Sequence, residues 1–434
     1  MRLVVALFFA FHAGAAGAGE MFLRLQGSNT IGAKLAPALV EAWMRADGMR
    51  GITREERGAE ERRVTATDGR GDRIVVDIHA HGSTTAFTAL AAGQAELGMS
   101  SRPIKGKEVA DLAALGNMHS PAAEHVIGLD GIAVIVHPQN RLATLDKATV
   151  ARIFAGEIRD WAQAGGTAGP IRIYARDDKS GTWDTFKSLV LNELPLAPGA
   201  ARFESSTELS DRVAQDPGAI GFIGLPYVRQ AKALSISEKE TAPLAPTAFT
   251  VATEDYALAR RLYFYLPPNN PHPLARALAE YALSEGGQAV VAQEGFVSQT
   301  ILAGAMQPAA DAPEEYRQLT RGAQRLSLNF RFRAGSPSPD TKALRDAQRL
   351  AEFVRRPENM GRHLILCGFS DKEEVIALYS LDLSIQRADR IADLLLNQRV
   401  SPLRVRGYGN VVPVAANDNP LGRYKNRRVE VWIR

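Results

Sequence analysis

The pattern of apolar residues predicts both helices and strands along the first part of the chain. From Leu35 to Ala46, and over the shorter run from Thr149 to Phe154, apolar residues recur at intervals of three and four, which predicts helices. β-branched runs bounded by turn residues alternate with these stretches, and each of them predicts a strand. The predicted strands are Ile74 to Ile78, Ile132 to Val136 and Ile171 to Tyr174. Alternation of helices and strands from Leu23 to about Ile301 is typical of an α/β fold.

Two segments interrupt this alternation. Residues Met49 to Arg73 are charged and Gly-rich with little periodicity, and we interpret them as an inserted loop or hairpin. Ala303 to Glu315 is rich in Ala, Pro and acidic residues and predicts a linker. After it, a compact alternation of strands and helices predicts a small α+β domain. Its predicted strands are Leu326 to Phe332, Leu364 to Cys367 and Val429 to Ile433, and its predicted helices are Asp340 to Val354 and Ser384 to Asn397.

The N-terminus has the three parts of a secretory signal peptide. Arg2 is the positive residue, Leu3 to Phe11 is a short apolar run, and Ala16-Gly17-Ala18 supplies the small residues at which a signal peptidase cuts. The run is too short to span a bilayer and no later stretch of that length is uncharged, so we expect a soluble periplasmic protein after cleavage behind Ala18. The predicted divisions are a signal peptide (1–18), a first domain (19–302), a linker (303–324) and a second domain (325–434).

Composition and cysteine content narrow the functional classes. The 434 residues are 45% hydrophobic and 23% charged, as in folded soluble proteins, and the net charge is +4. Acidic and basic residues are interspersed, which argues against a nucleic-acid-binding tail. Cys367 is the only cysteine, so it excludes an internal disulfide and a lipid-bearing N-terminal cysteine. Its apolar neighbours favour a buried residue over a reactive thiol.

Short segments of Ser, Thr and Gly recur after strand-like runs of the first domain. Helix N-termini leave backbone N–H groups unpaired and carry partial positive charge, so such segments suit an anion. For any one segment, ordinary N-capping is the simpler explanation. Four of them in one α/β domain, with the guanidinium of Arg176 close to the last, favour a tetrahedral oxyanion as ligand. The segments are Gly27 to Thr30, Gly82 to Thr85, Ser100-Ser101 and Ser180 to Thr182.

The first domain resembles the phosphate-binding proteins of high-affinity phosphate transporters, the PstS-like solute receptors. The resemblance runs from about Leu23 to Ile301 and is carried, in this order, by GSNTIGAKLAPALVEAW, HGSTTAFTALAAGQAELGMSSRPI, IFAGEIRDWAQAGG, ARDDKSGTWDTF, AIGFIGLPYV and GGQAVVAQEGFV. It implies a type II-like periplasmic-binding-protein fold, in which two α/β lobes joined by crossing strands close over the ion. The phosphate-binding residues that it implies are Thr30, Ile31, Ser83, Thr84, Ser100, Ser101, Arg176, Ser180, Gly181 and Thr182.

One position departs from the best-known members of this family. They have an aspartate there, which accepts the proton of hydrogen phosphate and repels anions that lack one. This chain has Ser101 at that position, followed by Arg102. The resemblance therefore implies phosphate as the ligand, with sulfate or another oxyanion rejected less strongly than in those members.

Other chemistry of the first domain has less support. His79 and His81 point to one face of a predicted strand, as metal ligands do, but no Cys or further His stands at ligand spacing. We interpret them as a solvated or hydrogen-bonded pair. The chain has no GxSxG nucleophile motif and no residue that stands out as a base. We therefore expect a binding protein that is not an enzyme and has neither a cofactor nor a metal.

The second domain resembles the OmpA-like peptidoglycan-binding domain over roughly Leu326 to Arg434. The matching blocks are LILCGFSD, LSIQRADRIADLL, VRGYGNVVP and GRYKNRRVEVWI. Asp371 follows a strand and Arg387 lies on the next helix, so the two can pair with the ammonium and the carboxylate of one zwitterion. In the family that molecule is the diaminopimelate of the peptide stem, whose ammonium the resemblance assigns to Asp371. The peptidoglycan-binding residues that it implies are Asp371, Leu383, Arg387, Asn426, Arg427 and Arg428.

Departures near this pair leave a second interpretation open. Phe369-Ser370 replaces the family's usual His-Thr, and the stretch before the LSxxRA motif lacks its common Gly and Asn. That interpretation is a domain of this family that binds peptidoglycan weakly. A simpler interpretation of Asp371 and Arg387, independent of these departures, is an ordinary surface salt bridge, which contributes little to stability.

Together the two domains predict a receptor for phosphate or a similar oxyanion, held at the peptidoglycan and outer membrane for uptake, storage or sensing. The implied partners are the anion, peptidoglycan and an ABC-type transporter permease, and no nucleic acid. The alternative is an envelope scaffold or adhesin whose lobes have lost their ligand and whose main activity is peptidoglycan binding. A phosphatase is a weaker third interpretation.

Overall fold

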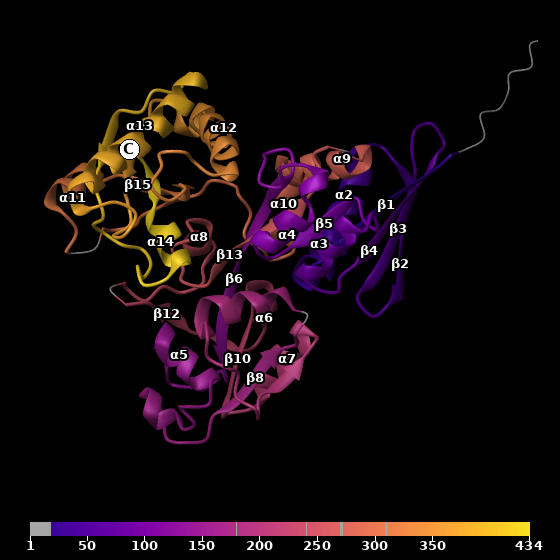
Figure 1. The fold of residues 1–434 in the computed structure, drawn as a ribbon, viewed down its shortest axis with the longest axis horizontal. Helices are drawn as coiled ribbons and strands as arrows, with labels where there is room; N and C mark the ends of the chain where they lie inside the picture. Colours follow the sequence, from indigo (N-terminus) through magenta and orange to yellow (C-terminus); the bar gives the residue numbers. More distant parts are fainter. Residues whose placement is uncertain (1–18, 179, 240, 270–271, 309–310) are drawn as a thin grey trace, which may run out of the picture.

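The computed structural model describes residues 19–178, 180–239, 241–269, 272–308 and 311–434. The predicted signal peptide, residues 1–18, lies outside them. Figure 1 shows three bodies: a lobe built from both ends of the first domain, a second lobe from its middle, and a C-terminal domain beside the strands that join the lobes. The expected two-lobed α/β fold, followed by a small α+β domain, is confirmed. Among the described helices none is long and apolar enough to cross a membrane.

The first lobe is built on parallel strands covered by helices. β1 (Glu20–Gly27) pairs in parallel with β4 (Arg73–His79) and β5 (Leu97–Ser100). The helix predicted at Leu35 to Ala46 is α2, with the same bounds, because its apolar stripe is buried in the lobe's core. Burying one such side chain, Leu39, contributes about 1.5–3 kcal/mol. The other helices of this lobe include α1 (Asn29–Gly32), α3 (Ser83–Ala91), α4 (Gly106–Asp111), α9 (Pro273–Leu283) and α10 (Glu285–Gln293).

The charged segment Met49 to Arg73 forms a hairpin at the edge of this sheet. β2 (Arg50–Gly58) and β3 (Glu61–Thr67) pair antiparallel, and β3 pairs in turn with β4. Of the two interpretations, loop or hairpin, the hairpin is confirmed. Val64 and Ala66 of β3 are buried, whereas β2 is exposed almost throughout, so a charged strand closes this edge of the sheet.

Two antiparallel strands join the lobes. β6 (Glu124–Val136) pairs along most of its length with β13 (Ala259–Tyr265) and along its last part with β10 (Ala219–Gly224) of the second lobe. The strand predicted at Ile132 to Val136 is only the end of β6, because Asp130 and its glycine neighbours interrupt the apolar pattern before it. A single sheet of 11 strands therefore runs through both lobes.

The second lobe packs around a cluster of aromatic rings. Phe186 stacks on Phe222 with ring centroids 3.9 Å apart, and Phe154 meets both rings edge-on. The helix predicted from Thr149 and the strand predicted from Ile171 correspond to α5 and β8. The bounds in this lobe are β7 (Thr144–Asp146), α5 (Lys147–Phe154), β8 (Arg172–Arg176), α6 (Gly181–Phe186), β9 (Ala201–Phe203), α7 (Ser206–Gln215), β11 (Lys232–Ala233), β12 (Ser235–Ser237) and α8 (Ala248–Ala252).

The C-terminal domain is a five-stranded sheet, in the order β14-β15-β18-β16-β17, that carries two long helices. α12 (Thr341–Arg355) and α13 (Ala377–Asn397) bury Leu350 and Ile391 in the domain's core. α13 begins well before the predicted Ser384. The other elements are β14 (Ala303–Gly304), α11 (Glu314–Thr320), β15 (Gln324–Arg331), β16 (Leu364–Gly368), β17 (Arg404–Gly407), α14 (Pro420–Asn426) and β18 (Arg428–Ile433).

The segment predicted as a linker, residues 303–324, is largely built into this domain. β14 pairs with β15, and α11 buries Tyr316, whose hydroxyl donates to Glu430 Oε2 at 2.7 Å. The prediction failed because the composition is rich in Ala, Pro and acidic residues, although the one aromatic side chain, Tyr316, anchors the segment.

The C-terminal domain packs beside the joining strands through buried ion pairs. Arg261 of β13 pairs with Glu254 at 2.6 Å and with Asp340 of the C-terminal domain at 2.7 Å. Arg331 of β15 reaches back to Glu254 at 3.2 Å. Burial raises the pKa of Glu254, but Arg261 and Arg331 outweigh it and lower that pKa to about 2. Removing one partner of a buried pair costs about 3–5 kcal/mol, so these pairs fix the second domain against the first.

Candidate functional site

Four hydroxyl groups from both lobes gather between them. Thr30 and Ser83 stand in the first turns of α1 and α3, Ser101 follows β5, and Thr182 stands in the first turn of α6. The hydroxyl oxygens of Thr30 and Thr182 are 3.2 Å apart, and those of Ser83 and Ser101 are 3.3 Å apart. All four side chains are buried. We call these four residues the interlobe cluster.

Gly181 allows the second lobe to come this close. A Cβ atom on Gly181 would lie 2.2 Å from Ser101 Oγ and 2.5 Å from Ser83 Oγ, so no side chain fits there. The hydroxyl oxygen of Ser180 accepts the backbone N–H groups of Thr182 and Trp183, at 3.2 and 3.4 Å, and thus caps α6. Of these two predicted residues, Gly181 borders the cluster and Ser180 shapes the helix behind it.

The guanidinium in the interlobe cluster belongs to Arg260, on β13. Its Nη2 donates to Thr182 Oγ1 at 2.9 Å and to Thr30 Oγ1 at 3.2 Å, and its Nη1 donates to Ser101 Oγ at 3.5 Å. The side chain is buried. No motif pointed to this residue, although two adjacent arginines, Arg260 and Arg261, in a strand of otherwise apolar and aromatic residues were a visible signal.

Arg260 is balanced by Asp130 of the neighbouring strand β6. Asp130 Oδ2 accepts Nε and Nη2 of Arg260 at 3.0 and 2.6 Å, and its Oδ1 accepts the backbone N–H of Leu225 at 3.0 Å. Asp130 is 0% exposed. The pair therefore brings donors into the cluster without adding net charge there. No sequence motif pointed to Asp130 either.

Arg176, which the resemblance assigned to the anion, makes other contacts. Its guanidinium donates to the carbonyl oxygens of Phe203 and Glu204, at 3.2 and 2.7 Å, and to Ser206 Oγ. Burial lowers the pKa of Arg176 below its ordinary value. These bonds hold the end of β8 against the start of α7. The structure thus places Arg260, rather than Arg176, among the hydroxyl groups.

The remaining predicted residues of this domain lie around the interlobe cluster. The hydroxyl of Ser100 donates to the carbonyl of Arg102 at 2.7 Å, and exposed Thr84 accepts Arg102 Nη2 at 3.2 Å. Ile31 is buried in the core of the first lobe, so it can offer only its backbone. Arg102 itself pairs with Glu108 at 2.6 Å, so the positive charge next to the cluster is neutralised.

A cavity of about 600 Å³ opens beside the interlobe cluster. Ser101, Arg260 and Tyr263 line it from the first domain, and Tyr424 and Lys425 from the second. Both domains therefore border the space next to the candidate anion site.

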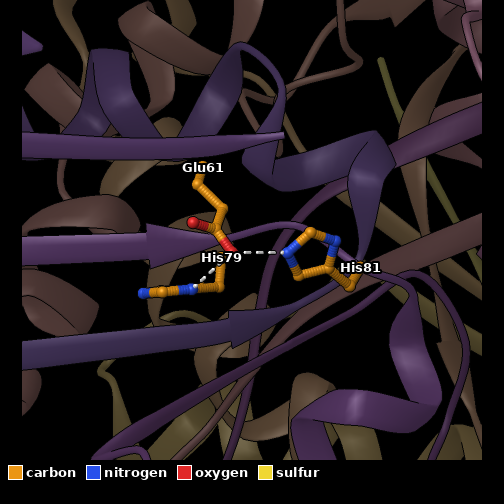
Figure 2. A group of neighbouring side chains, drawn as sticks. All are labelled: Glu61, His79 and His81. Carbon is orange, nitrogen blue, oxygen red and sulfur yellow. Dashed lines mark hydrogen bonds and ion pairs between the residues drawn. The ribbon is translucent and has the colours of Figure 1, made fainter. Parts of the chain in front are cut away.

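His79 and His81 share one carboxylate (Figure 2). Glu61 Oε1 lies 3.3 Å from His79 Nδ1 and 3.0 Å from His81 Nε2. Glu61 and His79 are direct partners across β3 and β4, which places these two side chains on one face of the sheet, and His81 follows just beyond β4. Of the two interpretations left open for the histidines, solvated or hydrogen-bonded, the contacts with Glu61 favour the second. The three groups, within 4.8 Å of one another, also have the donor types of a zinc site.

In the C-terminal domain, Asp371 and Arg387 are both buried, and each is engaged by a third residue. Asp371 Oδ1 accepts the backbone N–H groups of Glu373 and Glu374 at 2.7 and 2.9 Å, and its Oδ2 accepts Arg427 Nη1 at 2.8 Å. Arg387 holds the Glu374 carboxylate through two N–H groups at 2.6 and 2.5 Å. The interpretation as a surface salt bridge between Asp371 and Arg387 is therefore wrong. We call Asp371, Glu374, Arg387 and Arg427 the Arg387 pocket.

The other predicted residues hold the fold around this pocket. Asn426 Oδ1 accepts the backbone N–H groups of residues 414 and 415 at 2.9 and 3.1 Å. The guanidinium of Arg428 lies 4.0 Å from the centre of the Phe369 ring. Leu383 is 7% exposed on α13. Of the residues that the sequence singled out, Arg427 is the one that joins Asp371 and Arg387 in the pocket.

Comparison with known proteins finds two families on the chain. A model described as PBP superfamily domain matches residues 66–286, and a model of the OmpA family matches residues 331–427. The phosphate-binding protein PstS of Pseudomonas aeruginosa is 29% identical over 241 residues, which are 52% of this chain and 74% of that protein. PstS of Bacillus subtilis is 28% identical over 226 residues, 52% of this chain and 71% of that protein.

A solved structure supports the fold of the first domain. A phosphate transporter substrate-binding protein from Clostridium perfringens, crystallised with bound phosphate, is 24% identical with a TM-score of 0.50. The match covers 64% of this chain and 99% of that one, and at this identity it shows the fold alone. The superfamily match covers about half of this chain and falls on the two lobes described above. The chain belongs to the PBP superfamily and carries a C-terminal domain of the OmpA family.

Proposed function

We propose that this protein binds a tetrahedral oxyanion between its two lobes, with inorganic phosphate as the first candidate, and that its C-terminal domain holds it to peptidoglycan in the periplasm. At the family level, the PstS relatives and the OmpA domain support phosphate binding and peptidoglycan association. The matched families are binding families, and the proposal joins their two activities in one protein without catalysis.

The interlobe cluster around Arg260 is the observation that supports the proposed anion binding. Hydroxyl groups and a guanidinium fork are the donors that a tetrahedral oxyanion needs, and here they are buried together. Each hydrogen bond to a charged group contributes about 1.5–3 kcal/mol. Closure of the lobes would exchange the ion's hydration for these donors.

The choice between phosphate and sulfate depends on a proton. Ser101 can donate or accept a hydrogen bond, but it does not repel an unprotonated anion as a carboxylate does. Asp130 is engaged by Arg260 and by the N–H of Leu225, so it does not replace the missing aspartate. Because the PstS relatives are named phosphate-binding proteins, we rank phosphate first, and we expect sulfate to compete with it.

The proposed attachment to peptidoglycan rests on the OmpA domain. We propose that Asp371, Arg387 and Arg427 bind the diaminopimelate of the peptide stem, with the ammonium at Asp371 and the carboxylate at Arg387. A receptor held at the wall gains local concentration near fixed partners. The partner that we propose is the permease of an ABC-type phosphate transporter, and storage or sensing would use the same two sites.

Calorimetric titration of the full mature chain with phosphate and then sulfate, at neutral pH, tests the anion half. We expect phosphate binding that sulfate weakens and that Arg260→Gln abolishes. No heat with either anion, from folded protein freed of bound ligand, would favour the envelope scaffold instead. Sedimentation with purified peptidoglycan tests the wall half. Turnover of a chromogenic phosphate ester, which we do not expect, would contradict the assignment as a binding protein.

A further inference from the structure

Glu374 fills the carboxylate position of the Arg387 pocket. Its Oε1 accepts Arg387 Nη1 at 2.6 Å and the backbone N–H of Asp371 at 2.9 Å. Its Oε2 accepts Arg387 Nη2 at 2.5 Å and the backbone N–H of Gly335 at 3.0 Å. The side chains of Glu374 and Arg387 are 1% and 0% exposed. Four N–H donors therefore converge on one carboxylate that is shielded from water.

These four donors would serve a ligand's carboxylate equally well. A guanidinium fork flanked by backbone N–H groups recognises a carboxylate by charge and geometry, whatever molecule carries it. The diaminopimelate proposed for this pocket brings a carboxylate to Arg387. Two carboxylates at one site repel each other, so the ligand's group and that of Glu374 exclude each other there.

Glu374 lies in a segment that can move without disrupting a helix or strand. Residues 372–376 belong to the connection between β16 and α13 and have no regular structure, and Lys372, Glu373 and Ile376 are exposed. The segment is held at Asp371, whose carboxylate accepts the N–H groups of Glu373 and Glu374, and at Arg387 through the Glu374 side chain. At the surface, the backbone N–H of Lys372 donates to Asn417 and Glu373 pairs with Arg423. Releasing Glu374 would leave the Arg387 guanidinium bonded, within the described residues, only to the backbone carbonyls of residues 333, 336 and 369, with its fork open to a ligand carboxylate.

We infer that Glu374 is a built-in competitor for the ligand carboxylate, so that peptidoglycan binds only after residues 372–376 release Arg387. This inference rests on the proposed attachment to peptidoglycan and identifies what limits its affinity. A competitor on the same chain acts at an effective concentration on the order of millimolar. The apparent affinity falls in proportion to the fraction of molecules whose pocket is open.

The test compares the full mature wild-type chain with Glu374→Gln and Glu373→Gln in binding to purified peptidoglycan and to free diaminopimelate. Glu373 is a matched control, because it is the adjacent glutamate and its side chain is 59% exposed beside Arg423. Losing one charged hydrogen-bond competitor should tighten binding about tenfold or more in Glu374→Gln. Glu373→Gln should stay within about twofold of wild type, as a surface change. Adding Arg387→Ala to Glu374→Gln should abolish the gain.

Each outcome separates the inference from the proposed function. If the wild type binds and Glu374→Gln binds no better, the inference is wrong and wall attachment stands. If neither binds, wall attachment is wrong and the inference falls with it. Binding by Glu374→Gln alone would support both. Should Glu374→Gln fail to fold, as judged by its melting curve, Glu374→Asp should show the same gain, because its shorter side chain keeps the charge but does not span to the fork.

Discussion

The interlobe cluster and the Arg387 pocket hold their charges in opposite ways. In the cluster, Arg260 is balanced by Asp130 on one side and faces neutral hydroxyl groups on the other. In the pocket, Arg387 already holds a carboxylate, that of Glu374. For the functions proposed above, the first site would offer its donors to an anion directly, whereas the second would first have to release the carboxylate of Glu374. A family motif therefore locates a site without telling whether its charges are free.

Arg260→Gln should have the largest effect and tests the first side of this contrast. It leaves Asp130 buried beside a neutral partner, which costs about 3–5 kcal/mol of stability, and it removes the guanidinium from the cluster. We expect anion binding to be lost. The double variant Asp130→Asn/Arg260→Gln should recover most of the stability but not the binding, as measured by denaturant unfolding and calorimetry. Anion binding that survives Arg260→Gln would return the role to Arg176.

Acid should weaken the buried ion pairs of Glu254 that hold the second domain against the first. The pKa of Glu254 is lowered from 4.5 to about 2, because Arg261 and Arg331 outweigh the effect of its burial. A carboxylate with a lowered folded-state pKa stabilises above its unfolded pKa, and this contribution is lost as pH falls from about 4.5 toward 2. At roughly 1.4 kcal/mol per unit, the loss is about 3 kcal/mol. Melting temperatures of wild type and Glu254→Gln against pH measure it, and equal slopes would contradict the assignment.

Ser101→Asp sharpens the contrast by giving the cluster a carboxylate, as the pocket already has. The new group would stand close to Arg260, whose Nη1 now lies 3.5 Å from Ser101 Oγ. It would accept the proton of hydrogen phosphate and repel sulfate, so the ratio of phosphate to sulfate affinity should rise about tenfold, or about 1.4 kcal/mol. Ser101→Asn is the neutral control. Calorimetry that found the same change for both anions would place Ser101 outside the binding site.

Thr84→Val should have the smallest effect, because the structure places Thr84 outside the interlobe cluster. Thr84 is exposed and accepts a hydrogen bond from Arg102 at 3.2 Å. Exposed substitutions usually change stability by no more than about 0.5 kcal/mol, and we expect anion affinity to stay within about twofold. A tenfold loss in the same titration would put Thr84 back into the site.

The fold could be predicted wherever the signal is local. α2 has its predicted bounds because an apolar stripe along one helix is visible within a few turns of sequence. α13 begins before the predicted Ser384 because the residues buried ahead of it include Ser380, and a buried polar residue leaves no mark in an apolar pattern. The tertiary environment, rather than the periodicity, decides such boundaries.

The site residues divide in the same way. The hydroxyl groups of the interlobe cluster were predicted because each stands at a junction that a short motif marks. Arg260 and Asp130 were missed because they meet only when β13 pairs with β6, across many intervening residues. Glu374 was missed because an acidic residue in an irregular segment looks like surface charge until its burial is known.

The ion pairs between the domains bear on how such a chain could be recombined. Glu254 and Asp255 lie buried in the first domain, and their partners Arg331 and Arg325 come from β15 of the second. A wall domain transplanted from another protein would have to bring arginines to those positions, or leave Asp255 buried without a charged partner and Glu254 with Arg261 alone. Exchange of either half by domain shuffling therefore requires repair in the other, and the fusion is less modular than two family matches on one chain suggest.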